Sequence, residues 1–302
     1  DGTILVRGAA TRPFEAASPL RDIEATLRLS GQRIVFEQMR GELAGQPVRF
    51  EGVVDFSQKR QGLPLLDVRL LGDNLPLTRK PELILRGDLD LVLSNATNDT
   101  PVISGEVRLR DSYFLGDLKQ LLPGKVAKPS RRPPYFSFPH EPFKRWALQV
   151  RLIGKEFMRV RTPLFRGVVS AGFRLRGTLD EPVALGEATI DSGLVQFPFS
   201  NLEVRQGIIS LTSDDPYHPG LFVTAESRTF GYDIRMTLSG KAQEPLMEFS
   251  STPSLTSEQI LLMLTAGELP RRGFGFSPEK RASTLALFVG KNILSQWTDD
   301  AG

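Results

Sequence analysis

The segment from residue 186 to residue 267 reads GEATIDSGLVQFPFSNLEVRQGIISLTSDDPYHPGLFVTAESRTFGYDIRMTLSGKAQEPLMEFSSTPSLTSEQILLMLTAG. Apolar and polar residues alternate through most of it, and the alternating runs end at Gly, Asp or Pro. Alternation with a period of two is typical of a β-strand that buries one face. The segment therefore predicts a series of short strands, followed by a change of pattern near its end.

That change predicts a helix that begins after Thr256. Gln259 stands at the third helical position, which fits a capping box, and Leu255 with Ile260 fits a hydrophobic staple. Gly267 fits the C-cap. The apolar stripe of this helix is Ile260, Leu261, Met263 and Leu264.

A second helix is predicted to begin at Ser277-Pro278 and to run toward the end of the chain. Leu285, Val289, Ile293 and Trp297 recur every four residues, so this helix is amphipathic. Its apolar face could pack on the open end of the sheet or lie in a membrane interface. The first alternative is favoured because the polar face is not strongly basic.

Period-two alternation also covers the chain before residue 186. Strands are predicted from the runs at 23–30, 88–93, 146–152 and 173–176, and the run at 232–239 continues the series. A loose repeat relates residues 86–114 to residues 176–197, with a weaker copy at 41–56. Such repeats predict an elongated sheet. If roughly 16–20 strands stack at about 4.8 Å, the sheet is about 75–95 Å long.

Four regions are expected along the chain: N-terminal β repeats (1–111), a helix and Pro-rich basic insertion (112–145), C-terminal β repeats (146–252) and a helical tail (253–302). The insertion holds a short helix near 117–122 and a Pro-rich loop at 121–143. Its basic residues are Lys125, Lys128, Arg131 and Arg132. A solvated linker is the favoured interpretation, and contact with anionic headgroups or a partner is the alternative.

Composition excludes several classes of function. The chain of 302 residues has 38 Lys and Arg against 35 Asp and Glu, a net charge of +3 that does not indicate nucleic-acid binding. It has no Cys, so disulfides and thiolate metal sites are excluded. No apolar run is long enough to span a bilayer. The start, DGTILVRG, lacks Met and a signal peptide, so we expect a fragment or mature segment whose membrane anchor lies outside it.

Residues suited to catalysis are few. His140 and His218 both neighbour Pro in loop-like contexts, and no HExxH, GxSxG or P-loop motif occurs. Asp214 and Asp215 precede Pro and are first a turn signal. We therefore expect no enzymatic activity, no cofactor and no metal. A hydrolase that uses Asp214, Asp215 and His218 is kept only as an alternative to be tested.

The apolar face of the predicted sheet is the main candidate for a functional surface. It must be hidden from water by a second sheet, by closure into a barrel, or by lengthwise folding into a trough that holds acyl chains. Periodicity alone favours an ordinary sandwich or solenoid core. If a trough forms, its predicted lining is Ile23, Leu27, Leu29, Leu89, Leu91, Leu93, Trp146, Leu148, Val150, Leu152, Phe173, Leu175, Ile234, Met236 and Leu238.

The C-terminal part of the chain resembles the TamB family, which is also described within the AsmA-like or bridge-like lipid-transfer group. The resemblance rests on Gly186-Glu187, on the runs 193–197, 202–210, 232–240 and 245–249, and above all on SSTPSLTSEQILLMLTAG at 250–267. Residues 1–111 resemble the less specific repeats that precede this region in the family.

The resemblance implies a mainly β fold: an elongated, curled sheet, or β-taco, with an apolar trough inside, here followed by two short C-terminal helices. It implies a Gram-negative periplasmic protein, tethered to the inner membrane, that carries phospholipid between the two membranes and supports outer-membrane protein assembly. The implied partner is an Omp85-type outer-membrane protein with POTRA domains, similar to TamA or BamA. Chloroplast relatives take part in protein import, so a plastid origin stays open.

One departure bears on the partner. In the family, further strands usually follow the helical stretch, whereas this sequence ends WTDDAG, so the segment that meets the partner is expected to lie outside it. The alternative to a lipid conduit is a closed-core β module that binds a partner by edge-strand pairing and carries no lipid.

Overall fold

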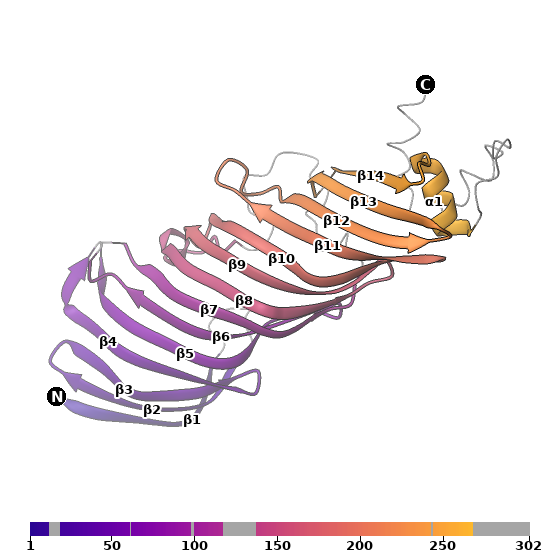
Figure 1. Cartoon of the computed structure of the whole chain (residues 1–302). Helices are drawn as coiled ribbons and strands as arrows, with labels where there is room; N and C mark the ends of the chain where they lie inside the picture. Colours follow the sequence, from indigo (N-terminus) through magenta and orange to yellow (C-terminus); the bar gives the residue numbers. More distant parts are fainter. Residues whose placement is uncertain (12–18, 61, 98–99, 117–136, 243, 268–302) are drawn as a thin grey trace.

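The computed structural model describes residues 1–11, 19–60, 62–97, 100–116, 137–242 and 244–267. In these residues the strands form a single sheet of 14, arranged side by side in chain order (Figure 1). The first seven are β1 (Gly2–Thr11), β2 (Leu20–Ser30), β3 (Arg33–Leu43), β4 (Gln46–Arg60), β5 (Leu63–Arg79), β6 (Leu83–Ser94) and β7 (Val102–Phe114). The others are β8 (Ala147–Arg161), β9 (Phe165–Gly177), β10 (Pro182–Phe197), β11 (Ser200–Leu211), β12 (Gly220–Thr229), β13 (Tyr232–Lys241) and β14 (Glu244–Thr252).

Every neighbouring pair is antiparallel except β7 and β8, which run parallel. Val102 pairs with Ala147 at one end of this pair, and Phe114 pairs with Val160 at the other. A parallel pair needs a long connection, and residues 115–146 supply it. The described end of that connection is a short 3₁₀ turn, η2 (Phe143–Arg145). The two β halves are therefore one continuous sheet.

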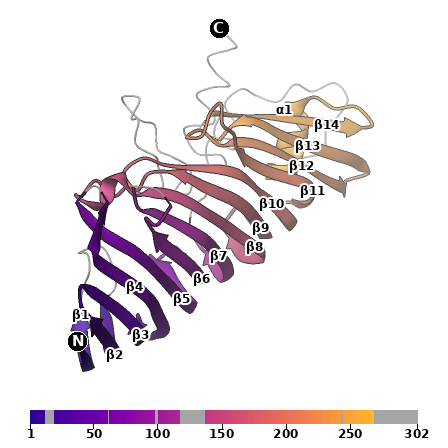
Figure 2. The ribbon, with the colours of Figure 1, turned by 90° about the vertical axis from the view of Figure 1, so that its left-hand side faces the viewer.

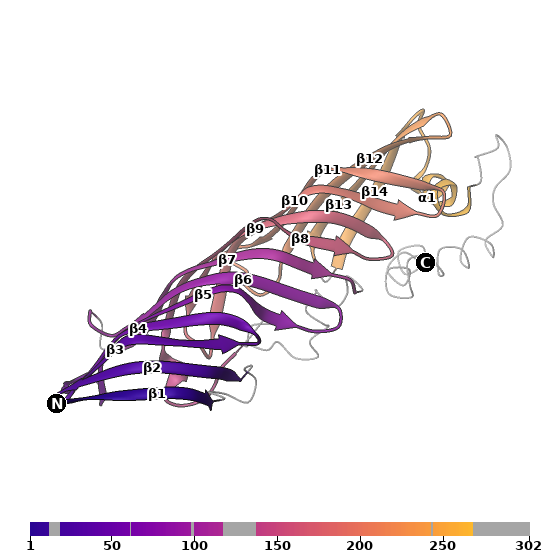
Figure 3. The ribbon, with the colours of Figure 1, turned by 90° about the horizontal axis from the view of Figure 1, so that it is seen from below.

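The sheet is curled because most strands carry a bulge along their length. Residues with positive φ at Asp22, Asn74, Asp111 and Glu156 lie at interruptions of the ladder register. Such bulges bend a strand and increase its twist. Figure 2 shows the strands arching over, and Figure 3 shows them succeeding one another from β1 to β14. The two edges do not meet, so the sheet is an unclosed trough.

The inner face is apolar along continuous rows of paired residues. One row crosses ten strands through Val6, Ala25, Met39, Phe50, Leu70, Leu91, Gly105, Val150, Leu175 and Ala184. A second runs through Val48, Gly72, Leu89, Val107, Leu152, Phe173 and Gly186. Directly paired residues project from the same face. The first row is about 43 Å long at about 4.8 Å per strand.

The outer face carries ion pairs both within strands and between neighbouring strands. Arg69 donates to Asp90 at 2.8 Å, and Glu106 lies 2.6 Å from Arg108 and 2.8 Å from Arg151. The hydrogen bond from Arg69 lowers the pKa of Asp90, and the one from Arg108 is the main cause of a lowered pKa at Glu106. These alternating charges keep the outer face in water.

The helix α1 (Ser257–Ala266) follows β14 and has the predicted caps. The Thr256 hydroxyl accepts from the Gln259 amide at 3.3 Å, and the Gln259 side chain accepts from the Thr256 amide at 3.0 Å. Gly267 ends the helix with φ 70°. The predicted helices near 117–122 and from Ser277, and the basic residues of the Pro-rich loop, lie outside the described residues.

The repeat found in the sequence has a structural reason. Gly105 and Gly186 each lie four residues after the proline of a Pro-Val pair, and Gly52 lies five residues after one; all three have a φ between 126° and 143°. A Cβ at each would lie 2.1 Å from a carbonyl oxygen of the neighbouring strand, namely that of Asp67, Asp90 or Gly172. Only glycine fits such a close approach.

Two expectations from the sequence are corrected. The sandwich or solenoid core that periodicity alone favoured is wrong, because the described residues form one sheet with no second sheet against it. The described strands number 14 rather than 16–20, which gives about 62 Å rather than 75–95 Å. The excess arose because bulged strands such as β5 (Leu63–Arg79) are longer than the usual strand. The mainly β, curled trough is confirmed, and the four regional boundaries stay a prediction.

Candidate functional site

The inner face from β1 to β10 is the candidate site, because many of its apolar side chains are only partly covered. Of the fifteen residues predicted to line a trough, five are buried: Ile23, Leu148, Val150, Ile234 and Met236. The other ten are half-buried: Leu27, Leu29, Leu89, Leu91, Leu93, Trp146, Leu152, Phe173, Leu175 and Leu238. Half-buried apolar side chains on an uncovered sheet form a surface that can take an apolar ligand.

These side chains form one continuous apolar interior. Ile23 packs with Val48 and Leu75, and Leu89 touches this cluster from the side. Leu89 also packs on the next cluster, which is built on Val107 and Val150 and includes Leu91, Leu152 and Leu175. Further clusters overlap in the same way as far as α1, through Met158, Val169, Val195 and Val204.

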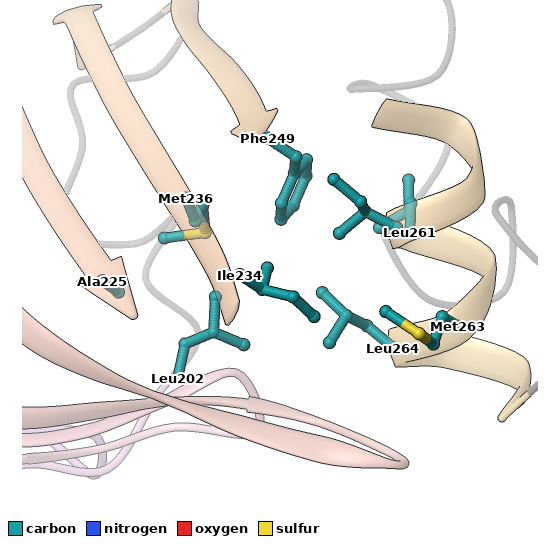
Figure 4. Packing of buried hydrophobic residues seen from close by; sticks show 9 residues of the cluster. Leu202, Ala225, Ile234, Met236, Phe249, Leu261, Met263 and Leu264 are labelled. Atoms are coloured by element: carbon teal, nitrogen blue, oxygen red, sulfur yellow. The ribbon is translucent and has the colours of Figure 1, made fainter. Parts of the chain in front are cut away.

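Helix α1 fills the trough at its C-terminal end. Ile234 and Met236 on β13, Leu202 on β11 and Phe249 on β14 form one buried cluster with the apolar residues of the helix (Figure 4). Six consecutive helix residues, 260–265, are buried, and a helix buried all round is enclosed rather than laid on a surface. Ile234 and Met236 therefore face the trough interior under α1 rather than in its open part, and their role in binding lipid stays a prediction.

Trp146 and Leu238 lie outside the row that defines the open part of the trough. Trp146 precedes β8, and its ring lies 4.8 Å from the ring of Phe143. Its indole Nε1 is buried and makes no hydrogen bond in the described part of the chain. Leu238 pairs with Val223 and Met247 on the inner face near α1.

Several lining residues were missed in the sequence. Met39, Phe50 and Leu70 stand in the ten-strand row, where Leu70 is directly opposite the predicted residue Leu91. The signal at Leu70 was obscured because Leu71, which projects from the other face, interrupts the alternation. Val48, Phe50 and Gly52 stand at every second position, which is the spacing of an inward-facing strand. The third of them has no side chain, so only two apolar residues carried this alternation.

The residues kept for a hydrolase form a surface turn between β11 and β12. Asp215 lies 2.6 Å from Lys241 and 2.5 Å from His218, and the bond from Lys241 is the main cause of its lowered pKa. Asp214 is exposed beside them. These ion pairs join two neighbouring turns of the sheet. They explain structurally why Asp215, His218 and Lys241 lie together. Among the described residues, no group of three His, Asp or Glu could hold a metal ion.

No described helix is both long and apolar enough to cross a bilayer. His140 stacks edge-on against Phe138 at 5.0 Å and takes part in the aromatic group before β8.

The fold and its inner face define an elongated, unclosed β-trough of the β-taco type. The family model of the TamB C-terminal domain matches residues 37–300, so the chain belongs to the TamB family. The comparison with curated proteins gave no match.

Family membership gives the chain a role in envelope lipid transport or assembly. The TamB family acts as a non-enzymatic bridge or transport module, is associated with the cell envelope, and is associated in general with an Omp85-type partner, TamA.

Proposed function

We propose that the chain carries phospholipid through its apolar trough, between the inner and outer membranes. The observation that supports this most directly is the ten-strand row of apolar residues on an unclosed sheet, in which Leu70, Leu91 and Leu175 stay half-buried. A closed core would cover these side chains, and no described element covers them between β1 and β10.

The energetics suit acyl chains. Burial of each CH₂ group contributes about 0.8 kcal/mol, so an acyl chain gains several kcal/mol by leaving water for the inner face. The charged headgroup would stay outside the trough, because burying an unpaired charge is costly. The apolar interior and the ion-paired exterior fit this division of an amphipathic ligand.

The finer parts of the proposal rest on the family. The chain would work in the periplasm, tethered to the inner membrane by a segment outside these residues. It would support outer-membrane protein insertion and assembly with an Omp85-type partner that carries POTRA domains. No catalysis, cofactor or metal is part of the proposal.

The test is native mass spectrometry of the purified chain, followed by extraction and identification of bound lipid. We expect phospholipid to copurify at a defined stoichiometry, or to load from liposomes. A mass without lipid that stays unchanged after incubation with liposomes would refute lipid carriage.

A second candidate is an interaction module that binds a partner by strand addition. It is favoured by one observation, namely that β1 and β14 each have a strand neighbour on one side only. Exposed strand edges are templates for pairing with another chain. A charged edge substitution that abolishes partner binding, in a chain free of lipid, would favour this candidate.

A further inference from the structure

One margin of the trough is chemically different from the other. We name the side at which β8, β10, β12 and β14 end the α1 margin, since the arrowheads of β12 and β14 point toward α1 in Figure 1. Large apolar side chains are exposed just after the end of β7, at Leu115 (56%), and in three hairpin turns, at Leu164 (37%), Phe199 (54%) and Phe230 (44%). The reversals at the opposite margin carry Asp180, Glu181, Asp214, His218 and Lys241.

Unpaired arginines lie beside the apolar residues. Arg161 on β8 is directly opposite Arg166 on β9, and Arg166 is directly opposite Leu194 on β10. In the part of the chain that the structure describes, neither guanidinium lies within 4.0 Å of a carboxylate. Arg159 also faces outward and lies 5.9 Å from the ring centre of Tyr113. Like charges directly opposite in a sheet are destabilising.

Among the described residues, opposed arginines elsewhere on the outer face have a carboxylate partner that Arg161 and Arg166 lack. Arg40 is directly opposite Arg49, but Arg40 forms an ion pair with Glu24. Arg151 is directly opposite Arg174, but Arg151 forms an ion pair with Glu106. Arg86 likewise opposes Arg110, which has Asp88. Arg161 and Arg166 form an arginine pair without such a carboxylate. A local arrangement that breaks a rule without compensation indicates a functional site, here one for an anion.

The apolar neighbours indicate which anion. Leu194 is directly opposite Arg166 and is 40% exposed, and Leu164 lies in the turn that joins Arg161 to Arg166. A hollow of about 750 Å³ on this face is lined by Arg159, Arg161, Arg166 and Leu194. Leu115 lines the same hollow as these arginines. The one carboxylate among the described residues that line it, Glu203, is paired with Arg205 at 3.1 Å. A free phosphate would gain nothing from exposed leucines, whereas a bilayer surface offers phosphates to arginine and an interfacial layer to leucine and phenylalanine.

We propose that the α1 margin docks on the surface of an anionic phospholipid bilayer. The contact is the arginine–leucine patch, formed by Leu115, Arg159, Arg161, Leu164, Arg166 and Leu194, with Phe199 and Phe230 extending it along the margin. Over β7 to β13 this margin is roughly 29 Å long. The docking does not depend on lipid in the trough. Its use, which rests on the proposed function, is to hold the open side of the trough against the membrane near α1.

The test is flotation of the full chain with vesicles of phosphatidylethanolamine and phosphatidylglycerol, compared with phosphatidylcholine vesicles. The patch variant is Arg161→Gln with Arg166→Gln. The matched control is Arg174→Gln with Arg176→Gln, which removes two exposed arginines from the outer face of β9 near the opposite margin. Both variants have the same net charge, so a general charge effect would weaken both equally.

We expect the wild type to bind the anionic vesicles more tightly than the neutral ones, and less so as salt is raised. The patch variant should bind about thirtyfold more weakly, at about fivefold per arginine, and the control should stay close to wild type. The thermal midpoint of the patch variant should not fall, because a repulsive pair has been removed.

Leu115→Ser with Leu194→Ser should weaken binding about tenfold or more without a change of charge. Equal losses in the arginine patch and control variants, or undiminished binding by the patch variant, would overturn the proposal. A wild type that binds no anionic vesicle would also overturn it and leave a protein as the occupant. Lipid load by mass spectrometry should be unchanged in the arginine patch variant, which separates docking from lipid carriage.

Discussion

The substitution Leu91→Arg tests the trough where its geometry is best defined. Leu91 projects from the inner face of β6, directly between Leu70 on β5 and Gly105 on β7. Arginine there can keep its aliphatic stem on the lining and extend its charged end toward the open side of the trough. The facing Gly105 has no side chain to obstruct it. We therefore expect the sheet to stay folded while the lining loses its apolar continuity.

The size of the effect follows from the strand spacing. A strand spacing of about 4.8 Å accommodates roughly four CH₂ groups of an extended acyl chain. At about 0.8 kcal/mol each, displacing them from the lining costs about 3 kcal/mol, or more than a hundredfold in lipid affinity.

Lipid occupancy by native mass spectrometry, with a thermal melt of the same sample, is the assay. The control is Ser104→Arg, which adds the same charge to the outer face of β7, opposite Val92 and Gln149. We expect the control to retain lipid. Equal lipid occupancy in Leu91→Arg and wild type would refute the trough as the binding surface. Global unfolding of Leu91→Arg would show instead that Leu91 belongs to a closed core.

Three further results are expected. Leu264→Ala, at a fully buried position of α1, should lower the free energy of unfolding in urea by about 2–5 kcal/mol. Its control, Leu246→Ala, is 58% exposed on β14 and should change the free energy of unfolding by less than about 0.5 kcal/mol. Similar effects of the two substitutions would mean that α1 does not fill the trough. Gly186→Ala should destabilise the folded sheet by at least about 1–3 kcal/mol, because the φ of Gly186 is 142° and the new Cβ would meet the Gly172 carbonyl. Gly172→Ala places its new Cβ in open space, so it should be nearly neutral in the same denaturation assay. Arginine neighbours lower the folded-state pKa of three outer-face carboxylates. The stability that these carboxylates contribute to the fold is therefore complete above their unfolded-state pKa of about 4 and is lost as the pH falls below it. Urea midpoints that stay constant between about pH 5 and pH 3 would contradict this pH dependence. These carboxylates are Asp90, Glu106 and Glu226.

Much of the fold could be predicted from the sequence because its strands are regular. Alternation in 23–30, 88–93 and 232–239 identified both the strands and the face that each one buries. The helix start at Thr256 was also predictable, because a capping box is a local pattern. Local signals of this kind do not depend on what lies across the sheet.

The rest depended on long-range register. No local pattern in β7 or β8 shows that these strands run parallel, because parallel and antiparallel strands bury alternate residues alike. Alternation placed Ile234 and Met236 on the inner face but could not show that α1 covers them. Arg161 lies opposite Arg166 because of the register of the β8–β9 hairpin, and the amino-acid composition carries no information on that register.

The position of α1 limits how a lipid could move under the proposed function. The ten-strand row ends at Ala184 on β10, and beyond it the interior of β11 to β14 is occupied by Ile260, Leu261 and Leu264. An acyl chain that reached this point could not continue past the helix without displacing buried apolar side chains, which costs several kcal/mol. Leaving sideways, through the open side of the trough, displaces none of them. A trough that is plugged at one end and open along its length therefore favours lateral exchange of lipid, and the chemistry of its margins then decides which surface receives it.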